Sequence, residues 1–336
     1  MLNACTDKDS GANPLTWMLV NLILTDTFIV LHAHVLRGVD MVQERKLELL
    51  AREKTVMLDG AYGSLLMEMG LEPGRPPDEC NLVSPEKVAD IHHRYLEAGS
   101  GIILANTFGS NRVKASKSGL GDHVRELNLE GAKLARKTSH QRALIAGDMG
   151  PTGELLEPHG PLSLEDAENA FREQAEALHE GGVDLIIIET MFDLGEALLA
   201  LRASLESTPL PVIVSLTFEK RGGRFATIMG NRVESSFDQL ARAGACAVGA
   251  NCSIGSREMS ELVEEMVGST SLPVIAQPNA GAPSLKSGKV AWEADPEEFA
   301  TDILKMVDLG ARLVGGCCGT NPEFMRIVKG KLDERR

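Results

Sequence analysis

Three of the six cysteines stand where their thiols could bind one soft metal ion. Cys317 and Cys318 are adjacent in the stretch LVGGCCGTNP (313–322), directly after an apolar run, and Cys252 ends another such run. Three thiolates with one open position are the arrangement of a catalytic zinc site, and thiolates favour zinc or copper(I) over magnesium or calcium. Adjacent residues bind one ion only where the backbone bends sharply, and the flanking glycines allow such a bend: Gly315, Gly316 and Gly319.

Other uses of these thiols fit the sequence less well. A disulfide between neighbouring cysteines is strained, and a redox dithiol typically has a CxxC spacing at the start of a helix. A structural zinc site usually takes all four ligands from the protein, often through CxxC pairs, and the sequence contains no CxxC. The remaining thiols, Cys5, Cys80 and Cys246, do not end comparable apolar runs. The pattern therefore favours a zinc ion held by the other three.

A repeated pattern of apolar runs and helical segments must position these residues. Eight apolar runs alternate with helix-period segments: 55–60, 101–107, 143–150, 185–190, 212–218, 247–253, 274–280 and 312–319. Continuously apolar runs are typical of parallel strands buried on both faces. Eight such units over about 280 residues predict an α/β protein, a single-domain (β/α)8 TIM barrel, for which roughly 250 residues is typical. A doubly wound open sheet is the alternative, but no GxGxxG or GxxxxGK[ST] loop follows any run.

The segments between the runs carry signals for the start and end of helices. Ser163 is expected to cap a helix that ends at Gly181–Gly182, and Asp295 is expected to cap another. A third helix is expected to end at Gly99. Because no antiparallel hairpin signal stands out between the strands, the sequence predicts parallel pairing.

Polar or sulfur-bearing residues stand at the expected carboxyl ends of the strands. They are Asp59-Gly60, Asn106-Thr107, Asp148, Glu189-Thr190, Asn251-Cys252, Asn279 and Cys317-Cys318. Active sites of this fold lie at that end of the barrel, and alternate strands send side chains into the same layer. We therefore expect Cys252, from the sixth strand, to converge with Cys317 and Cys318, from the eighth. Asp148 is expected only to cap a loop.

The first forty residues fit poorly with this pattern. The stretch WMLVNLILTDTFIVLHAHVL (17–36) raises the question of a membrane span, but Asn21, Asp26, His32 and His34 lie inside it, and charges at membrane depth are costly. It also lacks convincing features of a secretory signal. We expect residues 1–40 to be a poorly attached extension, disordered or arising from a mis-called start codon, and residues 41–336 to form the barrel domain.

Composition and charge argue against several classes of partner. The chain has 336 residues and a formal net charge of −14, which argues against binding to nucleic acid or to an anionic membrane. Hydrophobic residues make up 43% and charged residues 24%, an ordinary composition for a globular protein with a sizeable core. Six cysteines are too few for a disulfide scaffold in a chain of this length; they indicate reduced thiols and a cytoplasmic location.

Seven motifs follow one another along the chain between about residues 55 and 328. They are VMLDGAYGSLL, NTFGSN, GPTGELLEPHG, IIIETMFD, GANCSIG, QPNAGAP and GGCCGTNPEFM. Together they resemble the zinc-dependent homocysteine S-methyltransferases, and among these most closely the homocysteine-binding module of cobalamin-dependent methionine synthase. The Asn-Cys pair and the Gly-Gly-Cys-Cys-Gly run are the most specific of these features.

This resemblance implies a role for each candidate residue. Cys252, Cys317 and Cys318 would hold Zn²⁺, and the homocysteine sulfur would take the fourth position. Asp59 and Glu189 would bind the substrate ammonium, and backbone N–H groups around Gly60 and Ala61 would bind its carboxylate. The asparagines at the strand ends would complete the substrate-binding set by ordering its loops: Asn106, Asn251 and Asn279.

Zinc is needed because a free thiol is a poor nucleophile at neutral pH. With a pKa near 8.5, only a few per cent of it is thiolate at about pH 7. Coordination to zinc deprotonates a thiol. Three anionic sulfurs already neutralise Zn²⁺, so a bound homocysteine thiolate keeps enough electron density to attack a methyl group. The implied reaction is the methylation of homocysteine to methionine.

The resemblance leaves the methyl donor open. The chain ends at Arg336, without the folate and cobalamin modules of methionine synthase or the long C-terminal segment of betaine-using relatives. Relatives that use S-methylmethionine usually have arginine at the position of Gly319. We therefore expect methylcobalamin on a separate methyl-corrinoid protein as the donor. The alternatives are S-methylmethionine or betaine as donor, another thiol as acceptor, and a non-catalytic zinc-binding scaffold.

Overall fold

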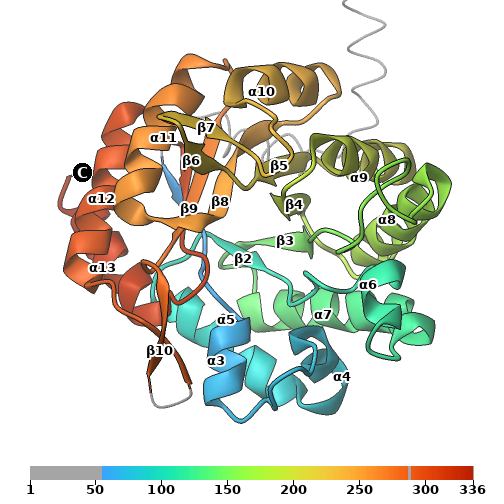
Figure 1. Cartoon of the computed structure of the whole chain (residues 1–336). Helices are drawn as coiled ribbons and strands as arrows, with labels where there is room; N and C mark the ends of the chain where they lie inside the picture. The colour runs from blue at the N-terminus through green and yellow to red at the C-terminus, as the bar shows by residue number, and fades with distance from the viewer. Residues whose placement is uncertain (1–54, 287–288, 336) are drawn as a thin grey trace, which may run out of the picture. The chain divides into compact units, whose positions relative to one another are not determined.

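Eight parallel strands form the centre of the structure, a computed structural model that describes residues 55–286 and 289–335 (Figure 1). In chain order they are β1 (Val56–Met57), β2 (Ile102–Leu104), β3 (Leu144–Met149), β4 (Leu185–Met191), β5 (Val212–Leu216), β8 (Ala247–Gly255), β9 (Val274–Asn279) and β12 (Leu313–Val314). From β2 to β12, strands that follow one another in this series are neighbours in the sheet, and β12 also pairs with β1, which gives the order β1-β12-β9-β8-β5-β4-β3-β2. The predicted TIM barrel is confirmed, and each predicted run contains the core of its strand.

Helices connect the strands and surround the barrel (Figure 1). The α-helices are α3 (Gly63–Glu68), α4 (Cys80–Val83), α5 (Pro85–Glu97), α6 (Arg112–Ser116), α7 (Val124–Ser139), α8 (Leu164–Glu180), α9 (Leu194–Ser207), α10 (Val233–Arg242), α11 (Ser256–Gly268), α12 (Pro296–Leu309) and α13 (Pro322–Asp333). Short 3₁₀ turns cover Pro77–Glu79 and Gly121–His123. Two predicted caps are confirmed, because Ser163 accepts the N–H of Asp166 and Asp295 accepts those of Glu297 and Glu298.

The strands separate two layers of apolar side chains. On β4, Leu185 and Ile187 belong to the cluster inside the barrel, whereas Ile186 and Ile188 pack in the larger cluster that includes the helices. The interior cluster consists of Leu58, Ile102, Leu104, Ala146, Leu185, Ile187, Ile213, Ala247, Ile275 and Leu313. Successive side chains of a strand point to opposite faces. Because both faces are buried here, the strands read as continuous apolar runs.

A side chain helps to close the barrel between β1 and β2. No ladder joins these two strands in the described part of the chain. Instead, the Gly101 N–H donates to the Met57 carbonyl oxygen at 2.8 Å, and the Leu104 N–H donates to Asp59 Oδ2 at 2.8 Å. Asp59 therefore occupies the position of a strand carbonyl at the carboxyl end of this seam.

The predicted parallel pairing of the eight strands is confirmed, but two antiparallel hairpins also occur, although no hairpin signal stood out in the sequence. One hairpin consists of β6 (Glu219–Arg221) and β7 (Arg224–Ala226), and the other of β10 (Pro283–Lys286) and β11 (Lys289–Trp292). The turn of the first contains Gly222 and Gly223 with φ of 57° and 81°, a left-handed conformation that glycine adopts without steric cost. The pair Gly222–Gly223 is the sequence feature that could have predicted this hairpin. Both hairpins are insertions after barrel strands and leave the parallel sheet intact.

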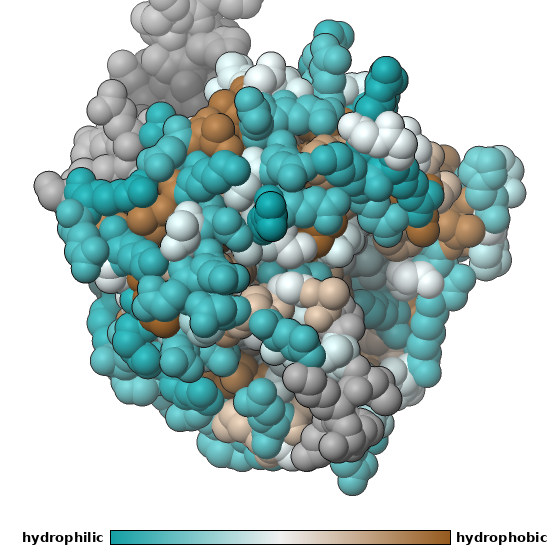
Figure 2. All heavy atoms as spheres, turned by 60° about the vertical axis from the view of Figure 1, so that its left-hand side comes forward, coloured by the Kyte–Doolittle hydropathy of each residue, from teal (hydrophilic) through white to brown (hydrophobic). Residues whose placement is uncertain are grey.

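Several predictions concern residues outside the described part of the chain. These are the extension over residues 1–40, the domain boundary at residue 41 and the apolar stretch 17–36. In the described part, none of the helices combines the length and apolarity required to cross a membrane. Figure 2 shows a face that is covered mainly by hydrophilic side chains, with apolar ones in separate small areas.

Candidate metal and substrate site

The sulfur atoms of Cys252, Cys317 and Cys318 lie within 4.8 Å of one another. The Cys252 and Cys318 sulfurs are 3.9 Å apart. In a tetrahedral site with Zn–S bonds of about 2.3 Å, two sulfur ligands lie about 3.8 Å apart. The cluster thus has the dimensions of a zinc site, and it offers three ligands, which leaves a fourth position for another molecule.

Cys252 reaches this cluster because β8 is irregular at its end. Asn251 pairs with Gln277, but the next pair in register is Gly255 with Asn279, so β8 contains extra residues between these two points. Within that bulge Cys252 and Ser253 have φ of 61° and 59°. Non-glycine residues adopt this left-handed conformation only where the surrounding structure imposes it. The bulge turns the Cys252 thiol toward the end of β12.

The turn with Cys317 and Cys318 is fixed by backbone hydrogen bonds to β9. The Cys317 N–H donates to the Pro278 carbonyl oxygen, and the Cys318 carbonyl oxygen accepts the Ala280 N–H, both at 2.9 Å. Thr320 packs beneath this turn. A Cβ atom on Gly316 would lie 2.3 Å from Thr320 Oγ1, and one on Gly60 would lie 2.4 Å from it. Glycine is therefore required at both positions by close contact with one threonine.

The three thiols and Asn279 form one hydrogen-bonded group. Hydrogen bonding among the three thiols lowers the pKa of the Cys252 thiol and raises the pKa of the Cys317 and Cys318 thiols. The Asn279 side chain also hydrogen-bonds Cys252 and favours its anionic form. Thiols bind a metal as thiolates. The group thus contains one sulfur that is readily ionised and two that a cation would have to deprotonate.

Asn251 connects this cluster to two neighbouring strands. Its Oδ1 accepts the Thr190 N–H at 2.8 Å and the Ser215 hydroxyl at 2.7 Å. Its Nδ2 donates to Thr190 Oγ1 at 2.7 Å and to Cys317 Sγ at 3.8 Å. Asn251 is fully buried, and these contacts use its side chain to hold β4, β5 and β8 in place around the sulfurs.

Asp59 and Glu189 are buried carboxylates at the same end of the barrel. Asp59 is fully buried and Glu189 is 8% exposed. Burial raises the pKa of Asp59 to about 7, although hydrogen bonds from Leu104 and Tyr62 oppose the shift. Burial, followed by the charges of Cys252 and Asp59, raises the pKa of Glu189. Two buried acids with raised pKa values indicate a site for a cation.

The other residues that were predicted to bind the substrate differ in the hydrogen bonds that they make within the protein. The Asn106 amide donates to the Pro77 carbonyl oxygen and to Asn81 Oδ1, so it orders the loop before α4. Among the described residues, the hydrogen bond of the Ala61 N–H is a long one of 3.4 Å, to Thr320 Oγ1. The neighbouring N–H of Gly60 belongs to the same turn. The structure thus brings Asp59, Glu189 and the cysteines to one end of the barrel, and it places Asn106 in a loop-ordering contact.

Trp292 covers Gly319, next to the adjacent cysteines. Gly319 has a φ of 81°, and a Cβ atom built there would lie 2.1 Å from Trp292 Cγ. The indole belongs to the end of the β10–β11 hairpin and packs against the core. Neither Trp292 nor Thr320 was singled out by the sequence, because no local pattern brings them to the cysteine turn.

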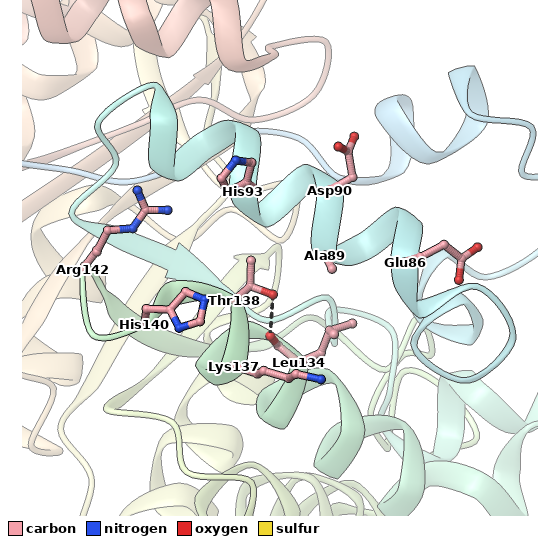
Figure 3. A pocket seen from close by; sticks show the side chains of 9 residues that line it. All are labelled: Glu86, Ala89, Asp90, His93, Leu134, Lys137, Thr138, His140 and Arg142. Atoms are coloured by element: carbon pink, nitrogen blue, oxygen red, sulfur yellow. Dashed lines mark hydrogen bonds between the residues drawn. The ribbon is translucent and has the colours of Figure 1, made fainter.

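A separate open groove of about 550 Å³ lies on the outer surface between α5 and α7 (Figure 3). Glu86, Asp90, Lys137 and Arg142 are among its lining residues, so its charges are mixed. It contains none of the predicted site residues. His140 and Arg142 precede β3 in the chain, which places this side of the groove at the opposite end of the barrel from the cysteines.

The fold and the site together define a TIM-barrel protein with a three-cysteine cluster at the carboxyl ends of its strands. The sequence model described as homocysteine S-methyltransferase matches residues 56–332. The chain belongs to the homocysteine S-methyltransferase family and is an enzyme of that family, as its motifs predicted.

The relatives include methionine synthases from two mycobacteria. The protein from Mycobacterium leprae is 31% identical over 300 residues, and that from Mycobacterium tuberculosis is 29% identical over 294 residues. These matches cover 84% and 82% of this chain but only 24% of each relative. The chain therefore spans about a quarter of the length of these relatives.

A similar fold is found in the homocysteine methyltransferase MmuM from Escherichia coli, in its metallated form. The two structures agree with a TM-score of 0.71 at 23% sequence identity, over 84% of this chain and 98% of MmuM. At this level of identity the likeness shows a shared fold.

Proposed function

We propose that this enzyme uses a zinc ion held by Cys252, Cys317 and Cys318 to methylate homocysteine to methionine. One observation carries the proposal: three sulfurs from two distant parts of the chain lie within 4.8 Å, at the end of a barrel where such enzymes bind substrates. The zinc ion would supply the Lewis acidity that lowers the pKa of the substrate thiol. Asn251 would keep Cys317 in the ligand position through its hydrogen bond.

The buried acids would bind and orient the amino end of homocysteine. Asp59 and Glu189 are acceptors with little access to water, and a substrate ammonium would compensate their charge. The Ala61 N–H, whose contact with Thr320 is long, would turn to the substrate carboxylate together with the Gly60 N–H. With both ends held, the homocysteine thiol would lose its proton to solvent, and the resulting thiolate would attack the methyl carbon. A C–S bond forms as the bond between methyl and donor breaks, and the donor keeps the electron pair.

A methyl-corrinoid protein is the donor that we favour. Two relatives are named methionine synthase, and the chain has Gly319 where relatives that use S-methylmethionine usually have arginine. Trp292 occupies the space into which a side chain at that position would point. Methylcobalamin on a separate protein is therefore proposed as the donor, and homocysteine as the acceptor.

The proposal is tested by measuring zinc and methyl transfer in the same preparations. The wild type should hold about one zinc per chain and transfer methyl from methylcobalamin to homocysteine. Cys317→Ala should lose both, because it removes one of three ligands. Cys246→Ala is the matched control, since Cys246 is a partly buried cysteine outside the cluster. Zinc retained by Cys317→Ala would refute the ligand set. Transfer only from S-methylmethionine or betaine would refute the donor, and turnover only of another thiol would refute the acceptor.

A further inference from the structure

Asp148 is a buried carboxylate that the proposed function leaves without a role. It is 6% exposed and stands near the end of β3, where Asp148 pairs with Ile187 of β4. Its backbone is fixed: the Thr107 hydroxyl donates to its carbonyl oxygen at 2.8 Å, and Gln174 contacts the same oxygen. The side chain is thus held at one place on a rigid strand, where a polar group is costly unless it has a partner.

The side chain of Asp148 points into the barrel. Side chains of a strand alternate between two faces, and Ala146 belongs to the interior cluster. Asp148 is the next inward position on β3. On β4, Ile187 is an interior residue and Glu189 is the next inward position. Asp148 and Glu189 therefore lie on adjacent strands, inside the barrel, and follow the apolar interior residues toward the carboxyl end, where the polar site begins.

One carboxylate oxygen of Asp148 has no partner among the residues that the structure describes. Its Oδ1 is buried and has no hydrogen bond in the described part of the chain, and the same holds for Asp59 Oδ1, Gln277 Oε1 and Asn279 Oδ1. All four atoms are acceptors. The cation that acts on Asp148 electrostatically, Lys114, has its Nζ 4.2 Å from the Phe108 ring centroid and forms no ion pair with Asp148 among the described residues. Burial and the charges of Glu189, Asp78 and Asp59 raise the pKa of Asp148.

We propose that Asp148 is a third carboxylate of the ammonium site and makes the enzyme selective for thiols with a free α-amino group. An ammonium has three N–H donors. The proposed function assigns two of them to Asp59 and Glu189, and Asp148 Oδ1 accepts the third. This inference rests on the proposed function, since homocysteine is the ligand whose ammonium is bound.

A comparison of two thiols separates this role from a structural one. L-homocysteine and 4-mercaptobutanoate share the thiol, the chain length and the carboxylate, but only homocysteine has an amino group. Binding of each is measured by calorimetry to the zinc-loaded full chain, as wild type and as Asp148→Asn. Asp122→Asn is the control, because Asp122 is exposed and undergoes the same change in charge. Zinc content and thermal unfolding are measured for each protein.

We expect Asp148→Asn to weaken homocysteine binding by roughly tenfold to a hundredfold, as for loss of a hydrogen bond to a charged group. Binding of 4-mercaptobutanoate should change by less than about twofold, and Asp122→Asn should match the wild type for both ligands. Unchanged homocysteine affinity, or an equal loss for both thiols, would overturn the role of Asp148 alone. If the zinc-loaded wild type binds neither thiol, the proposed function fails, and this inference fails with it. Should Asp148→Asn not fold, Asp148→Ser is judged by the same two affinities.

Discussion

Asn251 donates a hydrogen bond to the sulfur of Cys317, with 3.8 Å between Nδ2 and Sγ. The same amide accepts the Thr190 N–H and the Ser215 hydroxyl. Outer partners of this kind fix the orientation of a metal ligand and the charge on its sulfur. The geometry of the cysteine cluster therefore depends on a residue that is not itself a proposed ligand.

Asn251→Ala is expected to weaken zinc binding by about 10- to 100-fold while all three cysteines remain. It should also lower the free energy of unfolding by about 1–3 kcal/mol, because buried groups of Thr190 and Ser215 lose their partner. Ser215→Ala is the control: it removes one hydrogen bond to Asn251 but none to sulfur. Competition with a chromogenic zinc chelator gives the affinities, and equal effects of the two substitutions would contradict the prediction.

Gly319→Ala is expected to destabilise the protein through two separate effects. A left-handed backbone costs a non-glycine residue about 1–2 kcal/mol, and the new Cβ would lie 2.1 Å from Trp292 Cγ. In a Trp292→Ala background the contacts with the indole disappear, and the backbone cost remains together with a contact to the retained Cβ atom of residue 292 at 2.7 Å. Denaturant unfolding of the four proteins in this double-mutant cycle should show a smaller loss for Gly319→Ala when Trp292 is absent. An identical loss in both backgrounds would show that the indole does not limit this position.

His92 is expected to make the protein sensitive to mild acid. It is fully buried, its Nε2 lies 3.2 Å from the Leu104 carbonyl oxygen, and its Nδ1 has no partner in the described part of the chain. Burial lowers the pKa of His92 to about 4 from its usual 6.5. The unfolded chain therefore binds a proton between these two values while the folded chain does not, so stability is lost as the pH falls through this window.

The measurement compares wild type with His92→Gln, which keeps a donor for Leu104. As the pH falls from about 7.5 to about 5.5, the unfolding free energy of the wild type should decrease by about 1 kcal/mol more than that of His92→Gln. Both proteins contain the same acidic groups with raised pKa values, so the contributions of these groups to the pH dependence of stability cancel in the difference. A constant difference across that range would contradict the prediction, because it would mean that His92 has the same pKa in the folded and the unfolded chain.

Removal of the proposed zinc ion is expected to destabilise the protein through the cysteine cluster. A ligand that binds only the folded state stabilises it by about 4 kcal/mol at a free concentration a thousand times its dissociation constant. Calorimetric scans should therefore show a lower melting temperature after treatment with a chelator and recovery when zinc is returned. Cys317→Ala should respond to neither step. A similar shift in that variant would place the stabilising ion elsewhere.

The sequence determined the fold and the family because the information for both is local and repeated. Each apolar run is a strand that is buried on both faces. In β4, for example, Leu185 and Ile187 belong to the cluster inside the barrel, and Ile186 and Ile188 belong to the cluster that includes the helices. Eight such strands have one common closed arrangement, and the position of polar residues at the strand ends follows from it. The cysteines could be selected on that basis, and the resemblance to the family then selected Asp59 and Glu189 among the carboxylates at the strand ends.

Only the tertiary structure decided how these side chains are aimed and what they touch. Cys252 faces the cluster because a bulge places it at positive φ, and Asp59 also accepts the Leu104 N–H at the barrel seam. Thr320 and Trp292 reach the site from other elements, and Asp148 stands among the inward residues of β3 with an oxygen that has no partner in the described part of the chain. Such features depend on contacts between residues far apart in the chain, and no periodicity or motif at a single position encodes them.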